Sequence, residues 1–482
     1  MRGFFGRGPE LALLAKRLRR VEDAGSGVAV ALRGRRQVGK SRLVQEFCDR
    51  AGVPYMFSSA TKGASPVEAV GSFLRDLRES ALPAESSMVP TSVGGSWPDA
   101  FRVLAAALPA CPCVVVLDEL PWLSEQDGLF DGALQTAWDR LLSSRPVLLL
   151  LLGSDLHMME RLTAYDRPFF GRADNMILGP LTPADVAEAL ELDAPGAIDA
   201  HLVTGGLPGI VRTWPRGTPA LDFLRREAED PAAAVFSIPE TALMSEFPNP
   251  DASRRVLEAV GAGDRTHANI ASAAGGREGA LPSGSLSPLL RRLTEEKRVL
   301  VLNEPVSTRP GRPALYHLAD SNLRLYLGML RAVQEQARRG RPEGGRRLID
   351  RRWTAWRGRA VEPLIRQSLE LAALSGHLPW PEAEAVGGWW NRQFDPEIDL
   401  IGADRAPLAT RIFFAGSIKW LASPFDAHDL AALHRTAPQV PGHDPATTGL
   451  VVASLNGLSP DVDTDAVDLL WTPQDVIGAW RP

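Results

Sequence analysis

The segment VAVALRGRRQVGKSRLVQEF, residues 28–47, limits what this chain can fold into more than any other segment. An apolar run leads into a turn that fits the pattern G-x-x-x-x-G-K-[ST], and a helical pattern follows. Glycines let the backbone of such a turn point its N–H groups at phosphate oxygens, and the N-terminus of the helix adds positive charge. We therefore expect a strand, a nucleotide-binding loop and a helix, with the binding residues Gly34, Arg35, Arg36, Gln37, Val38, Gly39, Lys40, Ser41 and Arg42.

Lysine is rare in this chain, because arginine fills almost all of the 53 basic positions. The five lysines are Lys16, Lys40, Lys62, Lys297 and Lys419. A lysine is a compact point charge, which the planar guanidinium of arginine is not. Lys40 stands where the β- and γ-phosphates of a nucleotide need such a charge, and the Ser41 hydroxyl stands where Mg²⁺ needs a ligand.

A second apolar run, in CPCVVVLDELPWL, ends in two acids. Asp118 is expected to hold Mg²⁺, and Glu119 to polarise the attacking water. A third apolar run, residues 146–152, ends in GSD, where Ser154 either senses the γ-phosphate or the water, or caps the end of the strand. Because strands and helices alternate here, the pattern predicts an α/β fold with a parallel sheet and a ligand at the carboxyl ends of its strands.

Seven segments keep the order found in the archaeal-type ATPases of the AAA+/STAND grouping, which the first 215 or so residues resemble. These segments are FFGRGPEL, GRRQVGKSRLVQEF, VVVLDELPWL, LQTAWDRLL, LLGSDLHMM, FFGRADNMILGPL and VTGGLPGIV. The resemblance implies ATP and Mg²⁺ as cofactors, Gly6 and Arg7 near the adenine, and a helical lid whose turn at Pro208 closes over the nucleotide. It also implies that Arg172 is a finger or sensor for the γ-phosphate, or else a residue whose ion pair positions the loop.

Length and composition favour a soluble protein of about three domains at 482 residues. The net charge of −5 provides no global attraction for nucleic acid. Three cysteines without a CxxC pattern argue against a disulfide scaffold and a zinc site. No apolar segment has the length of a signal peptide or a membrane span, so we expect a cytoplasmic protein.

The middle of the chain, residues 248–328, has the pattern of three short helices followed by a β-hairpin. This is the order of a winged helix-turn-helix, a module that members of the resembled family often carry. The third helix would present Ser283, Ser285, Arg291 and Arg292 to DNA, and the wing would present Arg309 and Arg312. The same module also serves protein–protein or intramolecular contacts, and both alternatives remain open. The arginine-rich residues 329–352 are either a linker that follows phosphates or a solvated pair of helices.

The last segment, residues 353–482, resembles the PD-(D/E)XK nuclease fold that ends related ATPases. Glu362 on a helix, Asp399 in EIDLIGAD and Lys419 in FFAGSIKW match its layout. The acid expected two residues before the lysine is replaced by Ser417, a weak ligand for a divalent ion, although Glu397 shares the face of Asp399. The segment therefore predicts the fold of a nuclease more strongly than its activity.

These patterns predict an ATP-hydrolysing switch that acts on DNA or a protein partner. The alternatives are an ATP-responsive DNA-binding regulator with negligible hydrolysis and an ATP-gated, metal-dependent nuclease. Oligomerisation is compatible with each of them. The expected domains are an ATPase core (1–180), a helical lid (181–247), the winged helix (248–328), the arginine-rich linker (329–352) and the nuclease-like domain (353–482).

Overall fold

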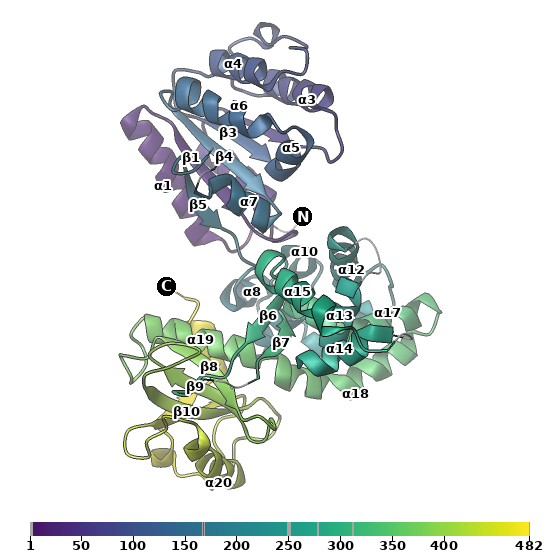
Figure 1. Cartoon of the computed structure of the whole chain (residues 1–482), viewed down its shortest axis with the longest axis vertical. Helices are drawn as coiled ribbons and strands as arrows, with labels where there is room; N and C mark the ends of the chain where they lie inside the picture. Colours follow the sequence, from purple (N-terminus) through teal and green to yellow (C-terminus); the bar gives the residue numbers. More distant parts are fainter. Residues whose placement is uncertain are drawn as a thin grey trace. The chain divides into compact units, whose positions relative to one another are not determined.

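The computed structural model describes residues 3–165, 167, 169–247, 252–276, 279–310 and 313–481. The chain forms two compact units, Met1–Pro180 and Leu181–Pro482 (Figure 1). No helix within the described ranges is long and apolar enough to cross a membrane.

The first unit is built around a five-stranded sheet in the order β2-β3-β4-β1-β5. All neighbouring strands are parallel, so their carboxyl ends lie at one edge of the sheet. The middle strands are apolar on both faces, as a sheet covered by helices on both sides requires. The strands are β1 (Val28–Arg33), β2 (Tyr55–Ser59), β3 (Cys113–Asp118), β4 (Val147–Gly153) and β5 (Ala173–Ile177).

Helices cover both faces of this sheet (Figure 1). The core on one face contains Ala29, Val115 and Leu149 of the strands together with Phe73, Trp97, Phe101 and Phe130 of α3, α4 and α6. The helical elements are α1 (Gly8–Ala24), α2 (Lys40–Ala51), α3 (Pro66–Glu79), η1 (Ser86–Met88), α4 (Trp97–Ala107), α5 (Leu120–Gln126), α6 (Phe130–Ala137), η2 (Trp138–Leu142) and α7 (Leu156–Thr163).

The second unit begins with helices and continues into a two-stranded hairpin. The residues of the expected lid form α8 (Pro183–Leu190), α9 (Ala194–Thr204), α10 (Pro208–Val211), α11 (Ala220–Glu227) and α12 (Ala234–Glu246). Three helices and an antiparallel hairpin follow, in the order that the sequence predicts, and Thr266 caps the second helix by accepting from Asn269 N. They are α13 (Ala252–Ala262), α14 (His267–Gly275), α15 (Ser283–Arg291) with its continuation η4 (Arg292–Glu296), β6 (Leu300–Asn303) and β7 (Leu315–Leu318).

The arginine-rich residues expected as a linker form packed helices instead. The helices of this region are α16 (Ser321–Leu325), η5 (Tyr326–Leu330), α17 (Arg331–Arg338) and α18 (Pro342–Ala360). Val333 and Ile349 are buried, because apolar residues at helical spacing give α17 and α18 an inner face. Several arginines are paired with acids, among them Arg338 with Glu240 at 2.8 Å. The segment is therefore helical, and its role in following phosphates stays a prediction.

The C-terminal part of the second unit is a mixed five-stranded sheet in the order β12-β11-β10-β9-β8. The pairs β8–β9 and β9–β10 are antiparallel, whereas β10–β11 and β11–β12 are parallel. Its elements are α19 (Glu362–Leu374), β8 (Ala385–Trp390), β9 (Glu397–Ala403), β10 (Ile412–Lys419), α20 (Ala427–Thr436), η6 (Ala437–Gln439), β11 (Gly449–Ser454), η7 (Thr464–Ala466), β12 (Leu469–Trp471) and α21 (Pro473–Gly478).

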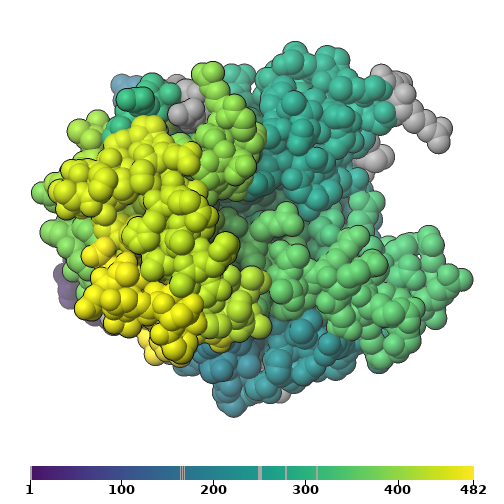
Figure 2. Space-filling model, turned by 90° about the horizontal axis from the view of Figure 1, so that it is seen from below, coloured from purple at the N-terminus to yellow at the C-terminus, as the bar shows by residue number. Residues whose placement is uncertain are grey.

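One hydrophobic core joins the expected lid to the C-terminal sheet. Ala197 and Ile198 of α9 belong to the same buried cluster as Leu369 of α19, Phe414 of β10 and Val476 of α21. The C-terminal residues, yellow in Figure 2, accordingly form a continuous body with the green helices. The second unit is therefore not a chain of independent modules.

Candidate active site

Three parallel strands of the first unit bring the predicted nucleotide site together. The loop 34–39 follows β1, Glu119 follows β3, and Ser154 follows β4. Since β4 lies between β1 and β3, the ends of the three strands are neighbours at one edge of the sheet. Sequence alone indicated this edge but not the position of β4 in the middle.

The loop itself needs backbone conformations that favour glycine. Gly39 has φ 93°, and Gln37 also adopts a left-handed conformation with φ 67°. A side chain at Gly34 would place its Cβ 2.4 Å from the carbonyl oxygen of Leu178, so only glycine fits there. The loop ends at Lys40, the first residue of α2, which makes the N-terminus of that helix part of the loop.

Lys40 is buried beneath the loop. Its Nζ donates to the carbonyl oxygens of Gly34 at 2.7 Å and Arg35 at 3.1 Å. Burial lowers the pKa of Lys40, and the charges of Glu119 and Asp118 oppose that effect. The ammonium is therefore held among carbonyl oxygens and acids at the position where a phosphate-binding lysine is expected.

The two predicted acids each accept a hydrogen bond from a predicted serine. Ser41 Oγ donates to Asp118 Oδ2 at 2.6 Å, and Ser154 Oγ donates to Glu119 Oε2 at 2.8 Å. Burial raises the pKa of Asp118, while the Ser41 hydroxyl lowers it. Glu119 has φ 54°, a left-handed conformation for a non-glycine residue. Ser41, Asp118, Glu119 and Ser154 thus lie together as the sequence predicts.

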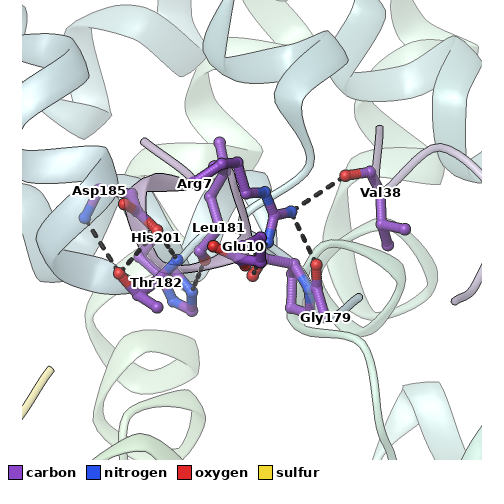
Figure 3. A network of polar contacts seen from close by, with 9 residues as sticks. Arg7, Glu10, Val38, Gly179, Leu181, Thr182, Asp185 and His201 are labelled. Atoms are coloured by element: carbon purple, nitrogen blue, oxygen red, sulfur yellow. Dashed lines mark hydrogen bonds and ion pairs between the residues drawn. The ribbon is translucent and has the colours of Figure 1, made fainter. Parts of the chain in front are cut away.

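Arg7 ties the start of the chain to this loop (Figure 3). Its guanidinium donates to the carbonyl oxygens of Val38 at 3.0 Å and Gly179 at 2.7 Å, and it pairs with Glu10 at 2.9 Å. Gly6 and Arg7 both have φ 65°, so the backbone turns sharply just before α1. The described contacts of Arg7 position the loop, and its predicted place near the adenine stays a prediction.

Three other arginines predicted for the site have described partners, namely Arg36, Arg42 and Arg172. Arg36 lies 6.0 Å from the ring of Trp122, and Arg42 pairs with Glu46 at 2.8 Å. Arg172 forms a bidentate pair with Asp139, with both N–O distances 2.8 Å, and donates to the Phe170 carbonyl. The hydrogen bond from Arg172 lowers the pKa of Asp139. For Arg172, the loop-positioning ion pair is thus observed, and the role of a finger stays a prediction.

Pro208 lies in the second unit, at the start of α10. The turn before it is held within that unit, because Leu181 N donates to the Gly206 carbonyl at 2.8 Å. His201 Nε2 in turn lies 3.1 Å from the Leu181 carbonyl (Figure 3). Closure of this turn over a nucleotide stays a prediction.

The hairpin that the sequence assigns as a wing is bonded to the C-terminal sheet. Val306 N donates to the Gly388 carbonyl at 2.9 Å, and Trp390 Nε1 donates to the Pro313 carbonyl at 2.7 Å. These contacts match the intramolecular alternative for this part of the module. Arg312 lies outside the described residues, whereas Ser283, Ser285, Arg291 and Arg292 are exposed on α15 and η4.

The structure does not bring all of the predicted nuclease-like residues of the C-terminal segment into one cluster. Asp399 Oδ2 accepts from Ser417 Oγ at 3.1 Å and from Ile418 N at 2.8 Å, and burial raises its pKa. Glu362 belongs to the same cluster as Asp399. Burial is the main cause that raises the pKa of Glu362, and the negative charge of Asp399 raises it further. Lys419 is separate, because its Nζ pairs with Asp429 at 2.6 Å.

Two residues at this second site were missed from the sequence. Arg366 donates to the backbone carbonyl of Asp399 at 2.8 Å and pairs with Glu362 at 3.3 Å. Its spacing of four residues from Glu362 was the available signal. Asp429, the partner of Lys419, lies in the first turn of α20 and gave no comparable signal. Within the described ranges, no group of three or more His, Cys, Asp or Glu residues is placed to hold a metal ion.

Comparison with known proteins finds a family model that matches part of the chain. Residues 3–151 match the family model described as the AAA ATPase domain. An uncharacterized protein of Methanocaldococcus jannaschii is 22% identical over 408 residues, which are 83% of this chain and 84% of that protein.

Solved structures show weaker likenesses over about two thirds of the chain. The Walker-type ATPase paby2304 of Pyrococcus abyssi matches with a TM-score of 0.49 and 18% identity, covering 67% of this chain and 96% of that one. The ORC2 protein of Aeropyrum pernix, in ADPNP–ADP complexes, matches with a TM-score of 0.43 and 14% identity, covering 69% and 94%.

Proposed function

Starting from an AAA ATPase domain over residues 3–151, we propose that the chain is a Mg²⁺-dependent ATPase that works as a nucleotide-controlled switch. The observation that carries the proposal is the arrangement of the two serine–acid pairs at the strand edge beside the phosphate loop. The pair Ser41–Asp118 is suited to bind a cation, and the pair Ser154–Glu119 is suited to orient a water molecule. Transfer of a phosphoryl group to water requires both.

The donor set suits Mg²⁺. The Ser41 hydroxyl and the Asp118 carboxylate are hard oxygen ligands whose atoms lie 2.6 Å apart. When bound, Mg²⁺ would supply positive charge that offsets the charge of the β- and γ-phosphates. Lys40 would place a further positive charge against the same phosphates, and the N–H groups of the loop would bind their oxygens.

Glu119 would orient the attacking water. Its carboxylate is fixed from two sides, by the Ser154 hydroxyl at 2.8 Å and by the left-handed backbone that follows Asp118. A carboxylate held in this way costs little reorganisation when it accepts a hydrogen bond from water in the transition state. Ser154 would act as a positioning residue for Glu119.

In the second unit, we propose a binding role for the C-terminal sheet rather than cleavage. Ser417 replaces an acid, Lys419 is paired with Asp429, and Arg366 lies between Glu362 and the Asp399 backbone. A nearby guanidinium disfavours a divalent cation at those carboxylates. The exposed face of α15 and η4 is available for DNA or a protein partner.

The test is ATP binding and turnover of the purified chain. We expect Lys40→Ala to weaken ATP binding about 100-fold or more, and Glu119→Gln to keep binding within about twofold while lowering turnover about 100-fold or more. Lys16→Ala, which removes an exposed lysine of α1, is the matched control. Unchanged turnover in both site variants would refute the proposal.

Titration of turnover with single- and double-stranded DNA at a stated salt concentration then separates the alternatives. Stimulation by DNA would support a switch that turns over on nucleic acid. A stable ATP-bound state without stimulation would favour the regulator with negligible hydrolysis, and Mn²⁺-dependent cleavage lost in Asp399→Ala would favour the nuclease.

A further inference from the structure

A pocket in the second unit gathers side chains from five separate parts of the sequence, namely residues 265, 303–317, 324, 359–366 and 390–399. It lies where the hairpin β6–β7 meets α16, the junction of α18 and α19, and the strands β8 and β9. Its walls are joined by backbone hydrogen bonds, including Val306 N to the Gly388 carbonyl and Tyr316 N to the Arg265 carbonyl at 2.8 Å. The pocket is therefore part of the folded framework of this unit.

The pocket is lined by four arginines: Arg265, Arg324, Arg359 and Arg366. Three carboxylates also line it: Glu362, Glu397 and Asp399. Two of the arginines have acidic partners, because Arg265 lies 3.3 Å from Glu397 and Arg366 lies 3.3 Å from Glu362. The Asp399 carboxylate is bound by the Ser417 hydroxyl and the Ile418 N–H.

The other two arginines have no acidic ion-pair partner in the described part of the chain. Arg324 is partly buried and donates to the backbone carbonyl of Arg359 at 3.1 Å. The Arg359 side chain is exposed at the pocket. Burial is the main reason that the pKa of Arg324 is lowered to about 10, and the charges of Arg265, Arg359 and Arg366 act in the same direction, opposed by Glu362. Positive charge in this pocket is therefore only partly compensated.

We propose that this pocket binds a phosphate group, with the guanidiniums of Arg324 and Arg359 as its main donors. Two guanidiniums without acidic partners match the charge of a phosphate dianion, and their planar forks match its oxygens. The phosphate group comes either from a nucleic acid or from free phosphate. The inference is independent of ATP hydrolysis, because its residues lie outside the first unit.

The experiment uses the full chain carrying Lys40→Ala, so that the phosphate loop does not compete for the probe. Binding of inorganic phosphate, of a 5′-phosphorylated oligonucleotide and of the same oligonucleotide with a 5′-hydroxyl is measured by calorimetry. We expect Arg324→Gln to weaken phosphate binding about tenfold or more, and Arg359→Gln to weaken it about threefold to tenfold.

Arg339→Gln is the matched control, because Arg339 is an exposed arginine of the same unit that pairs with Glu335. It should leave binding unchanged. If Arg324→Gln does not fold, Arg359→Gln decides, since its guanidinium is exposed and its loss removes little packing.

The probes distinguish the sources of the phosphate. Tighter binding of the 5′-phosphorylated strand, lost in the variants, supports a nucleic-acid end, whereas equal but variant-sensitive binding of both strands supports backbone phosphates. Variant-sensitive binding of inorganic phosphate alone supports free phosphate. Absence of binding by every probe, or equal binding in all variants, overturns the proposal.

Discussion

In the first unit, Ser41 donates a hydrogen bond to Asp118 over 2.6 Å, and in the second unit Ser417 donates to Asp399 over 3.1 Å. Each serine–acid pair has a lysine close to it in the sequence. The neighbours of the two lysines differ. Within the described residues, the hydrogen bonds of Lys40 Nζ go to backbone carbonyl oxygens, which a phosphate can replace. Lys419 instead forms an ion pair with Asp429. The comparison teaches that the same residue types acquire different chemistry from the residues that surround them.

The largest expected effect tests whether only the first pair serves ATP. Asp118→Asn should lower ATP turnover about 10³-fold, because the amide is a poor ligand for Mg²⁺. The matched variant Asp399→Asn should leave turnover of the folded protein within about twofold. Steady-state turnover at saturating Mg²⁺ and ATP measures both. A similar loss in the two variants would remove the distinction between the pairs.

Acid should affect the second unit through His201. Burial lowers the pKa of His201 to about 4, from an ordinary value of 6.5, so the unfolded chain binds the proton more readily between these values. Stability is therefore lost as pH falls from 6.5 towards 4. Between pH 7 and pH 4.5, His201→Gln should reduce the acid-induced loss of unfolding free energy by about 2.5 kcal/mol.

Urea unfolding, monitored by the hydrogen exchange of backbone amides in the second unit, measures this difference in the free energy of unfolding. The comparison of wild type with variant cancels the opposite contribution of Asp199, whose pKa is raised to about 6 by burial. His157→Gln, which changes a histidine of the first unit, is the control. An unchanged pH dependence in His201→Gln would show that His201 is accessible to protons in the folded state.

The smallest effect concerns the two serines that hold acids. Ser154→Ala should lower kcat about tenfold and leave KM unchanged, because Glu119 loses its positioning hydrogen bond while the nucleotide contacts remain. Ser417→Ala, the matched change in the second unit, should leave both constants unchanged. An increase in KM without a change in kcat would mean that Ser154 contacts the nucleotide instead.

The arrangement of the predicted nucleotide site could be inferred from the sequence, because the residue spacing that defines it is local. The spacing from Gly34 to Ser41 fixes a loop, and parallel strands that end in Asp118 and Ser154 must meet at one edge of the sheet. The order of helices and strands in the middle and C-terminal segments also followed from local patterns.

The second site was less predictable because its partners come from distant segments. Arg265 lies in the loop between α13 and α14, Arg324 in α16 and Arg366 in α19, and nothing in their sequence spacing brings them to one pocket. Asp429 of α20 forms an ion pair with Lys419, the last residue of β10, because the fold brings the start of α20 next to the end of that strand. The helices in the arginine-rich segment were one of two open alternatives, which composition alone could not separate.

The core that α9 shares with α19 and β10 has a consequence for how such chains can be recombined. Replacing residues 353–482 by an unrelated domain would expose Ala197 and Ile198, which are now fully buried. Such a chimaera would need compensating substitutions on α9 to stay folded. The C-terminal sheet is thus not an exchangeable cassette, and any displacement of α9 carries that sheet with it.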